Sequence, residues 1–311
     1  MTPRRTTDRG RGGFDIRQAA VVALPYAWLL LFFLAPFLIV LKISFSETAT
    51  TQPPYTPVFD LSEGLSGLIE KTRELTVANY LLLTEDALYW RSYLTSLRVA
   101  AVSTVLVLLI GYPLAYAMSR APARWRPTLV MLVILPFWTS FLIRVYAWMG
   151  ILGSEGVLYR VLNALGLVSE PLAILGTNTA VHIGIVYAYL PFMVLPLYAS
   201  LEQQDERLLE AAADLGCPPW QAFWRVTFPL SLPGVVAGSL LVFIPAVGEF
   251  VIPDLLGGSE SLMIGRTLWS EFFNNRDWPV SSAVAVVLLL VLVVPLVLFQ
   301  RAEQRRQERA A

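Results

Sequence analysis

The sequence predicts an all-α integral membrane protein with six transmembrane helices. Of its 311 residues, 56% are hydrophobic, and six apolar runs are long enough to span a bilayer, which takes about 20 residues in a helix. The runs lie near residues 20–45, 97–119, 128–152, 179–201, 232–255 and 280–300. Each run is expected to be helical, because lipid offers no hydrogen-bond partner to the backbone of an open strand or loop.

The basic residues indicate how these helices cross the membrane. Fourteen arginines fall in segments on one side, with five in residues 1–19, three in 120–127, two in 202–230 and four in 301–311. The segments on the other side carry six basic residues. Since cytoplasmic segments hold the excess of Lys and Arg, both termini are expected in the cytoplasm. The first run is too long for a signal-peptide core of about 7–15 residues, so an uncleaved first span is expected.

Three regions follow from this topology. Residues 1–18, rich in Arg, Gly and Thr, are expected to be a disordered cytoplasmic tail. Residues 19–300 form the transmembrane domain, and residues 301–311 form a second cytoplasmic tail. The longest external loop, 46–92, is expected to be periplasmic and shows helical patterns at 61–75 and 78–83. It is interpreted either as a cap for a soluble partner or as a spacer.

A polar island at residues 202–230 separates the fourth and fifth runs and predicts a helix–turn–helix. Asp205 is placed to cap the first helix, and Gly216 to end it in the left-handed conformation. Pro219 is placed to begin a second short helix, and Pro229 to stop it. Helical spacing puts four apolar residues on one face of the first helix, namely Leu208, Leu209, Ala212 and Leu215.

This island resembles the EAA loop of binding-protein-dependent ABC importer permeases. The matching positions are Glu210, Ala211, Ala212, Asp214, Gly216, Val226, Phe228 and Pro229. In that family the loop is the coupling helix that docks in a groove of the ATPase subunit. The small side chains of Ala211 and Ala212 suit such close docking. The alternative is an amphipathic cytoplasmic hairpin without a partner.

Further strings resemble the permease subunits of polyamine importers, most closely those of the putrescine type. They are ILPFWTSFLIRVYAWMGIL (134–152), IGIVYAYLPFMVLP (183–196), FIPAVGEFVIPDLLGG (243–258) and MIGRTLWSEFFNNRDWP (263–279). The resemblance implies a type I permease fold in the bacterial inner membrane. It also implies a working unit of two homologous permeases, two ATPase subunits with ATP and Mg²⁺, and a periplasmic substrate-binding protein. Nucleic acid is not an expected partner.

The residue counts exclude several kinds of site from the chain itself. A phosphate-binding loop needs the lysine of G-x-x-x-x-G-K-[ST], and neither Lys42 nor Lys71 lies in such a string. ATP is therefore expected to be hydrolysed on a separate subunit, and the chain to be a transporter subunit rather than an enzyme. With Cys217 as the only cysteine and His182 as the only histidine, no metal site or other cofactor is expected.

Three ionisable residues within the runs are candidates for the substrate path or gate, because charges inside a membrane are costly. Arg144 lies in the third run, and Glu249 and Asp254 lie in the fifth. A rise of about 1.5 Å per residue puts Arg144 and Glu249 at similar depth, so they are expected to pair or to face one cavity. Glu249 either attracts a polyamine or neutralises Arg144, with the second role slightly favoured. Asp254, further out and without an evident partner, is the better candidate for substrate contact.

Aromatic residues at these depths predict a cavity, since alkylammonium groups bind aromatic faces. The aromatic residues are Phe137, Trp138, Phe141, Tyr146, Trp148, Tyr187, Tyr189 and Phe192. Trp138, Tyr187 and Tyr189 are the candidates for the path, although interfacial anchoring and core packing also use such rings. Tyr187 and Tyr189 lie on different helix faces, so at most one is expected to line the path. Gly248, three residues after Pro245, marks the fifth run as the expected gate.

Together these features predict the permease subunit of an ATP-driven polyamine importer, with putrescine as the expected substrate. Within this class the alternatives are spermidine, an opine-like compound and ferric iron. Outside it, a proton-coupled secondary transporter would use Glu249 and Asp254 as proton sites, and a membrane scaffold would only recruit partners.

Overall fold

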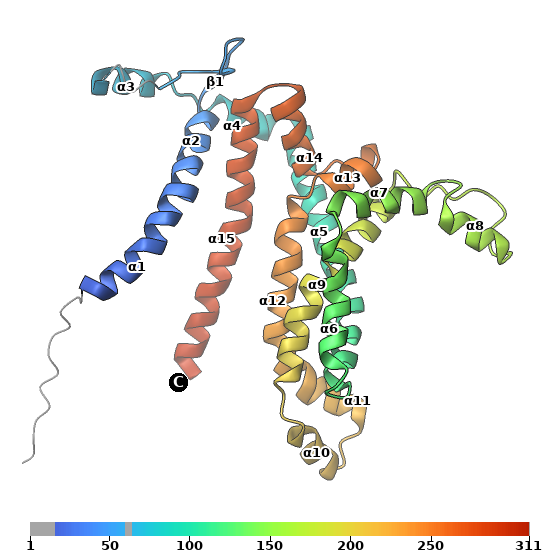
Figure 1. Ribbon diagram of the computed structural model, residues 1–311. Coiled ribbons are helices and arrows are strands. Elements are labelled where there is room, and N and C mark those ends of the chain that lie inside the picture. Colours follow the sequence, from blue (N-terminus) through green and yellow to red (C-terminus); the bar gives the residue numbers. More distant parts are fainter. Residues whose placement is uncertain (1–15, 60–63, 311) are drawn as a thin grey trace, which may run out of the picture.

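The computed structural model describes residues 16–59 and 64–310, and these residues are almost entirely helical (Figure 1). Six of the described segments are long and apolar enough to cross a membrane, which confirms the predicted fold class. Residues 1–15 of the predicted tail, 61–63 of the predicted loop helix and residue 311 lie outside the described ranges. The helices are α1 (Ile16–Leu29), α2 (Ala35–Ser44), α3 (Gly64–Arg73), α4 (Ala78–Glu85), α5 (Ala87–Arg120), α6 (Arg126–Ile134), α7 (Phe141–Leu152), α8 (Val157–Ala164), α9 (Asn178–Glu202), α10 (Arg207–Asp214), α11 (Pro219–Ala222), α12 (Phe228–Val247), α13 (Val251–Leu256), α14 (Ile264–Trp269) and α15 (Trp278–Ala310).

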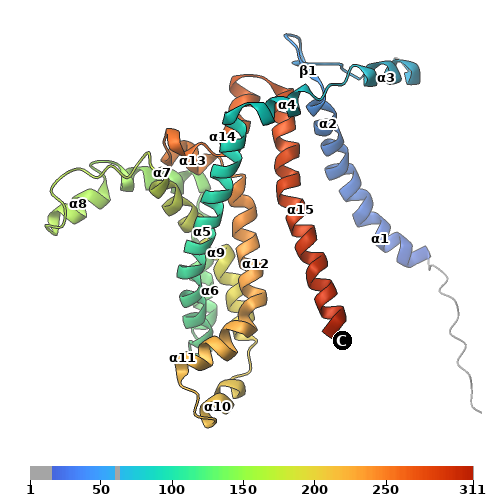
Figure 2. The same cartoon turned by 180° about the vertical axis from the view of Figure 1, so that it is seen from behind.

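Helices α5, α9 and α12 pack along one another and form the core of the molecule (Figures 1 and 2). The approach of α12 to α9 depends on residues without side chains. A Cβ at Gly238 would lie 2.8 Å from Sδ of Met193, and one at Gly234 would lie 2.6 Å from Cβ of Ser200. Small residues let transmembrane backbones approach closely, so this contact explains the tight α9–α12 pair.

The third and fifth predicted runs are not continuous helices, which corrects the expectation of one helix for each run. In the third, α6 ends at Ile134, a 3₁₀ turn covers Leu135–Trp138, and α7 begins at Phe141. In the fifth, α12 ends at Val247 and α13 begins at Val251. Pro136 and Pro245 each remove a backbone donor close to a break, and transmembrane breaks of this kind need neighbouring groups to satisfy the backbone.

The first span stands apart from this core, whereas the last packs against it through its first half, where Val280, Ala283 and Val284 are buried. Helix α1, the π-helical turn Leu30–Leu34 and α2 run on as one long helix, and α2 packs against α15 (Figures 1 and 2). From Val21 to Leu29 the side chains of α1 are exposed, and Leu24 is 77% exposed. An apolar surface of this kind is suited to contact with lipid or with another membrane helix.

The predicted external loop lies at the end of the bundle that carries α14, which we call the α14 end (Figure 1). It contains a short antiparallel hairpin of β1 (Glu47–Thr48) and β2 (Tyr55–Thr56), followed by α3 and α4. Asn79 Nδ2 donates to the carbonyl oxygens of Ser44 and Ser46, at 2.9 and 2.8 Å. Thr48 Oγ1 donates to Asp277 Oδ1 at 2.8 Å, so the loop is tied to both neighbouring spans.

A second group of contacts fixes α14 on the core. The backbone N–H of Ile264 donates to Ser96 Oγ at 2.8 Å, and the hydroxyl of Tyr89 donates to Oε1 of Glu271 at 3.1 Å. Glu271 lies in the π-helical turn Ser270–Asn274 that extends α14. A Cβ at Gly265 would lie 2.4 Å from the carbonyl oxygen of Gly248. The start of α14 therefore supports the break between α12 and α13 directly.

The α9–α12 contact makes a prediction about Gly234. Gly234→Ala should lower the free energy of unfolding by about 1–3 kcal/mol, the usual cost of an overpacked core. The measurement is the thermal unfolding of the detergent-solubilised protein. Gly150→Ala is the matched control, because Gly150 is also helical and a Cβ there meets nothing within 4 Å. Equal stability of Gly234→Ala and the wild type would contradict the importance of this approach.

Candidate functional site

The two helix breaks meet at a cavity of about 410 Å³, which we call the central cavity. The α6–α7 break supplies one wall, the α12–α13 break the second, and α9 the third. Its lining residues are Phe137, Phe141, Arg144, Ala188, Tyr189, Phe192, Pro245, Gly248, Glu249, Phe250 and Val251. Arg144 and Glu249 thus face one cavity, the second of the two arrangements expected from sequence. No ion pair joins them within the described residues.

Glu249 is only 8% exposed, and its carboxylate stabilises the α12–α13 break. Its Oε2 accepts a hydrogen bond from the hydroxyl of Tyr189 at 2.6 Å. Its Oε1 accepts from the backbone N–H groups of Val251 and Ile252, at 3.0 and 3.4 Å. These two groups are unpaired donors at the start of α13, so the side chain caps this helix. All three donors are neutral, so the carboxylate is hydrogen-bonded but its charge is not neutralised.

The guanidinium of Arg144 lies against aromatic rings on the opposite wall. Its Cζ is 5.3 Å from the ring centroid of Phe137 and 5.8 Å from that of Phe141. Its Nε is buried and has no hydrogen-bond partner in the described part of the chain. The cavity is therefore lined by one positive and one negative group that form no ion pair, together with several aromatic rings.

The three aromatic candidates differ in position. Tyr189 lines the central cavity, whereas Tyr187 faces away from it and packs edge-on against Trp148, with ring centroids 5.4 Å apart. Trp138 is 70% exposed and is not part of the lining. Its neighbour Phe137 takes that place, because the 3₁₀ turn changes which side chain of the third span points inward. The density of rings in the sequence predicts the cavity but does not select its members.

The expectation that Asp254 has no partner in the chain is wrong. Asp254 Oδ1 lies 3.0 Å from Nε of Arg266, because α14 folds back across α13. One turn away on both helices, the rings of Phe250 and Trp269 stack, with centroids 4.7 Å apart and an angle of 10°. Arg266 and Phe250 were not among the sequence candidates. The sequence offers a signal for Arg266 alone, which is a basic residue predicted on the same side of the membrane as Asp254.

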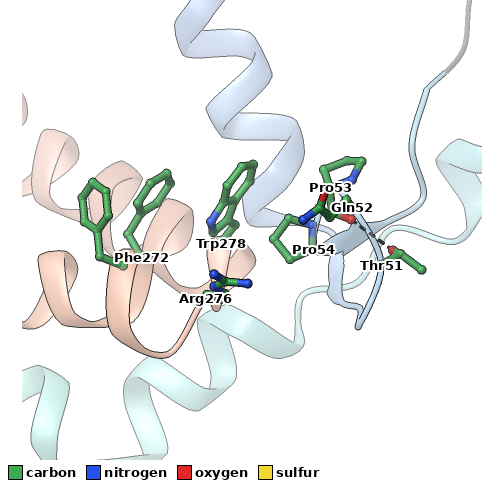
Figure 3. Close-up of a pocket in the computed structure, with 8 residues that line it drawn as sticks. Thr51, Gln52, Pro53, Pro54, Phe272, Arg276 and Trp278 are labelled. Carbon is green, nitrogen blue, oxygen red and sulfur yellow. Dashed lines mark hydrogen bonds between the residues drawn. The ribbon is translucent and has the colours of Figure 1, made fainter.

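A second cavity of about 430 Å³, the outer cavity, lies at the α14 end. Figure 3 shows the rings of Phe272 and Trp278 facing the turn that carries Pro53 and Pro54, with Arg276 beside them. Phe273 also lines this cavity and contacts Trp269, with ring centroids 4.0 Å apart. Through Trp269 and Phe250, a continuous row of rings joins the outer cavity to the central one.

The opposite end of the bundle, which we call the α10 end, carries the hairpin predicted at residues 202–230. Asp205 Oδ1 accepts from the backbone N–H of Arg207 at 3.0 Å and so caps the start of α10. Gly216 adopts φ 76° and ends α10, and Pro219 begins α11, as predicted. The prediction for Pro229 is wrong. The helix continues from α11 through the π-helical turn Phe223–Thr227 into α12, and Pro229, which has no N–H to donate, follows directly after that turn.

The residues of the hairpin motif lie at the surface. Glu210, Ala211, Asp214 and Gly216 are exposed, and Ala212 is partly exposed. Leu215, at the end of the apolar stripe, is 88% exposed. An apolar stripe beside small residues, with no covering element in the described chain, is suited to contact with another protein.

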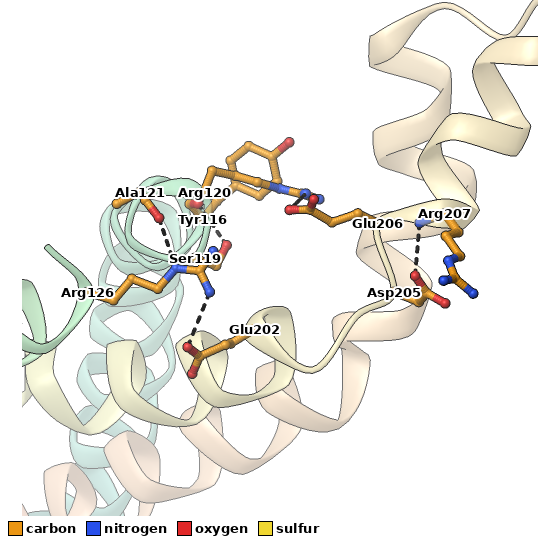
Figure 4. Close-up of polar contacts among 9 residues, drawn as sticks. All are labelled: Tyr116, Ser119, Arg120, Ala121, Arg126, Glu202, Asp205, Glu206 and Arg207. Carbon is orange, nitrogen blue, oxygen red and sulfur yellow. Dashed lines mark hydrogen bonds and ion pairs between the residues drawn. The ribbon is translucent and has the colours of Figure 1, made fainter. Parts of the chain in front are cut away.

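Ion pairs tie this hairpin to the core, as Figure 4 shows. Arg120 Nη1, at the end of α5, lies 3.2 Å from Oε1 of Glu206, and Arg126 Nη1 lies 3.5 Å from Oε1 of Glu202. Gln204 Nε2 donates to the carbonyl oxygen of Thr227 at 3.1 Å. A force on the hairpin would therefore reach α5, α6, α9 and α12 together.

Residues 108–309 match the family of binding-protein-dependent transport system inner membrane components. The chain is 41% identical over 287 residues to the spermidine/putrescine transport system permease protein PotB of Haemophilus influenzae, covering 92% of this chain and 94% of that protein. It is 44% identical over 229 residues to PotB of Escherichia coli K12, covering 74% and 83%.

A solved structure shares the fold. The crystal structure of a bacterial ABC transporter for the acidic polysaccharide alginate superposes with a TM-score of 0.67, at 17% identity. The superposition covers 94% of this chain and 96% of that one. The described helices thus have the arrangement of a type I ABC importer permease.

The contacts of Glu249 make a prediction about two tyrosines. Tyr189→Phe removes a hydrogen bond to a buried carboxylate and should lower the free energy of unfolding by about 1.5–3 kcal/mol. Tyr187→Phe removes the same hydroxyl two residues away, outside the central cavity, and should change stability little. Thermal unfolding of both variants in detergent tests this difference. Equal effects of the two substitutions would contradict the role assigned to the Tyr189–Glu249 hydrogen bond.

Proposed function

This chain belongs to the family of binding-protein-dependent transport system inner membrane components, and we propose that it lines the path of a polyamine through an ABC importer. The observation that carries the proposal is the central cavity, where Glu249 offers an unneutralised carboxylate between aromatic walls. An ammonium group would find an opposite charge there, and the methylene chain of a polyamine would find rings to pack on. Relatives named for spermidine and putrescine support this substrate class.

Putrescine is the polyamine that we propose first, with spermidine as its closest competitor. The relatives are named for both compounds, so similarity alone does not rank them. The Glu249 carboxylate attracts one ammonium group, and both compounds supply at least two. Spermidine is longer and carries a third amine, so competition between labelled and unlabelled polyamines compares the two directly.

The proposed assembly follows the family. The α10 end would face the cytoplasm, as the basic residues of the sequence indicate, and would dock its hairpin on an ATPase subunit that binds ATP and Mg²⁺. A second permease would complete the path, and a periplasmic binding protein would deliver the substrate at the α14 end. The ion pairs beneath the hairpin support this arrangement, because they offer a mechanical route from the ATPase to the core.

Asp254 is predicted from the sequence to contact the substrate, but in this proposal it has a structural role. Its ion pair with Arg266 reduces its attraction for a substrate amine. We propose that Asp254 and Arg266, with the stacked rings of Phe250 and Trp269, hold α13 against α14 beside the cavity. Glu249 is then the carboxylate of the path.

An opine-like compound is the second candidate, and Arg144 is the observation that favours it. A ligand with both an amine and a carboxylate would match Glu249 on one wall and the unpartnered Nε of Arg144 on the other. 4-Aminobutyrate tests this chemistry, because it replaces one ammonium group of putrescine with a carboxylate. Competition by 4-aminobutyrate and not by spermidine would favour the second candidate.

Uptake of labelled putrescine tests the proposal in cells that carry or lack the chain. Glu249→Gln keeps an acceptor for the α13 cap but removes the charge, and should lower uptake by roughly 10–100-fold. Glu155→Gln, an exposed glutamate away from the cavity, is the matched control. Equal uptake by cells with and without the chain would contradict putrescine as its substrate. Unchanged uptake by the Glu249→Gln variant would contradict the place of Glu249 in the substrate path.

The hairpin makes a separate prediction about coupling. Glu210→Ala should abolish most of the ATPase activity stimulated by the loaded binding protein, or prevent assembly with the ATPase, while the spans stay inserted. Co-purification and ATPase assays of the transporter measure both outcomes, with Glu155→Ala as the control. Normal assembly and normal stimulated ATPase activity in Glu210→Ala would contradict the coupling role proposed for the hairpin.

A further inference from the structure

The aromatic walls of the central cavity already hold a cation, and that cation belongs to the chain. The guanidinium of Arg144 lies over Phe137 and Phe141, at 5.3 and 5.8 Å from their ring centroids. Phe192 extends the same wall, edge-on to Phe137 with centroids 5.2 Å apart. The rings therefore form a cage of the kind that binds ammonium groups.

The polar contacts of Arg144 do not account for its position. Its Nε is buried without an acceptor, and no carboxylate of the described chain forms an ion pair with it. The one carboxylate of the cavity, Glu249, is occupied by Tyr189, Val251 and Ile252. The Nε of Arg144 is buried, but the guanidinium is held by rings and not by a counterion, so its release costs little.

We propose that Phe137, Phe141 and Glu249 form an alkylammonium site of the path, and that Arg144 is a tethered competitor for it. This inference rests on the proposed function and adds the regulation of the same site. An ammonium group that enters between the rings and Glu249 displaces the guanidinium. When the substrate leaves, the guanidinium returns and closes the cage.

A competing cation would keep the path from binding its substrate too tightly. A site that moves ions must attract them strongly enough to enter and weakly enough to leave. A carboxylate beside an aromatic cage would retain a polyamine with several charges. The guanidinium of Arg144 lowers this affinity, both by occupying the rings and by repelling a second positive charge.

The test is equilibrium binding of labelled spermidine and putrescine to the purified, assembled transporter without its binding protein. Arg144→Met keeps a long side chain but frees the cage, and should tighten spermidine binding about tenfold or more. Arg144→Lys keeps a competing cation and should bind like the wild type. Arg160→Met, which removes an exposed arginine of α8 outside the cavity, is the matched control for net charge.

Three further measurements make the outcome decisive. The tighter binding of Arg144→Met should disappear when Phe137→Leu is added, and turnover at saturating loaded binding protein should fall as affinity rises. If the Arg144→Met transporter does not assemble, the same binding measurement is made on Arg144→Gln, which also removes the charge. If the neutral variant of Arg144 binds spermidine with the wild-type affinity, Arg144 does not compete for the site.

The failure of this inference differs from a failure of the proposed function. If the wild-type transporter imports polyamines and Arg144→Met gains no affinity, only the proposed competition by Arg144 is contradicted. If the wild-type transporter does not import polyamines, the proposed substrate is contradicted, whatever the variant binds.

Discussion

The structure depends on how one carboxylate satisfies a broken transmembrane helix. A break in a membrane span leaves backbone donors without partners, which is costly where water is scarce. Glu249 accepts from two such donors at the start of α13, and Tyr189 orients it from α9. The same side chain caps the break and lines the cavity. A change in the geometry of the break therefore moves the negative charge that a substrate meets.

The central cavity also explains why two opposite charges lie in the spans without pairing. Glu249 is held by neutral donors on one wall, and Arg144 by aromatic rings on the other. Direct pairing would fill the space between them and leave little attraction for a substrate. Their separation keeps the cavity close to neutral overall while it still offers a local site for each kind of charge.

The sequence predicts the parts that depend on local pattern. The six spans follow from apolar length, and the Asp205 cap and the left-handed Gly216 follow from helix-end chemistry. The parts that depend on tertiary contacts are missed. Pro229 does not stop the helix, because a π-helical turn carries α11 into α12. Asp254 gains Arg266 only when α14 folds back, and the inward turn of Phe137 in place of Trp138 depends on a 3₁₀ segment.

The central claim is that a polyamine passes through the cavity between Glu249 and the aromatic wall. The most direct measurement is a structure of the assembled transporter trapped with spermidine inside the membrane. The account predicts an ammonium group beside the Glu249 carboxylate and over Phe137 and Phe141, with the Arg144 guanidinium moved off these rings. Spermidine bound elsewhere, with Arg144 still on the rings and Glu249 unchanged, would contradict it.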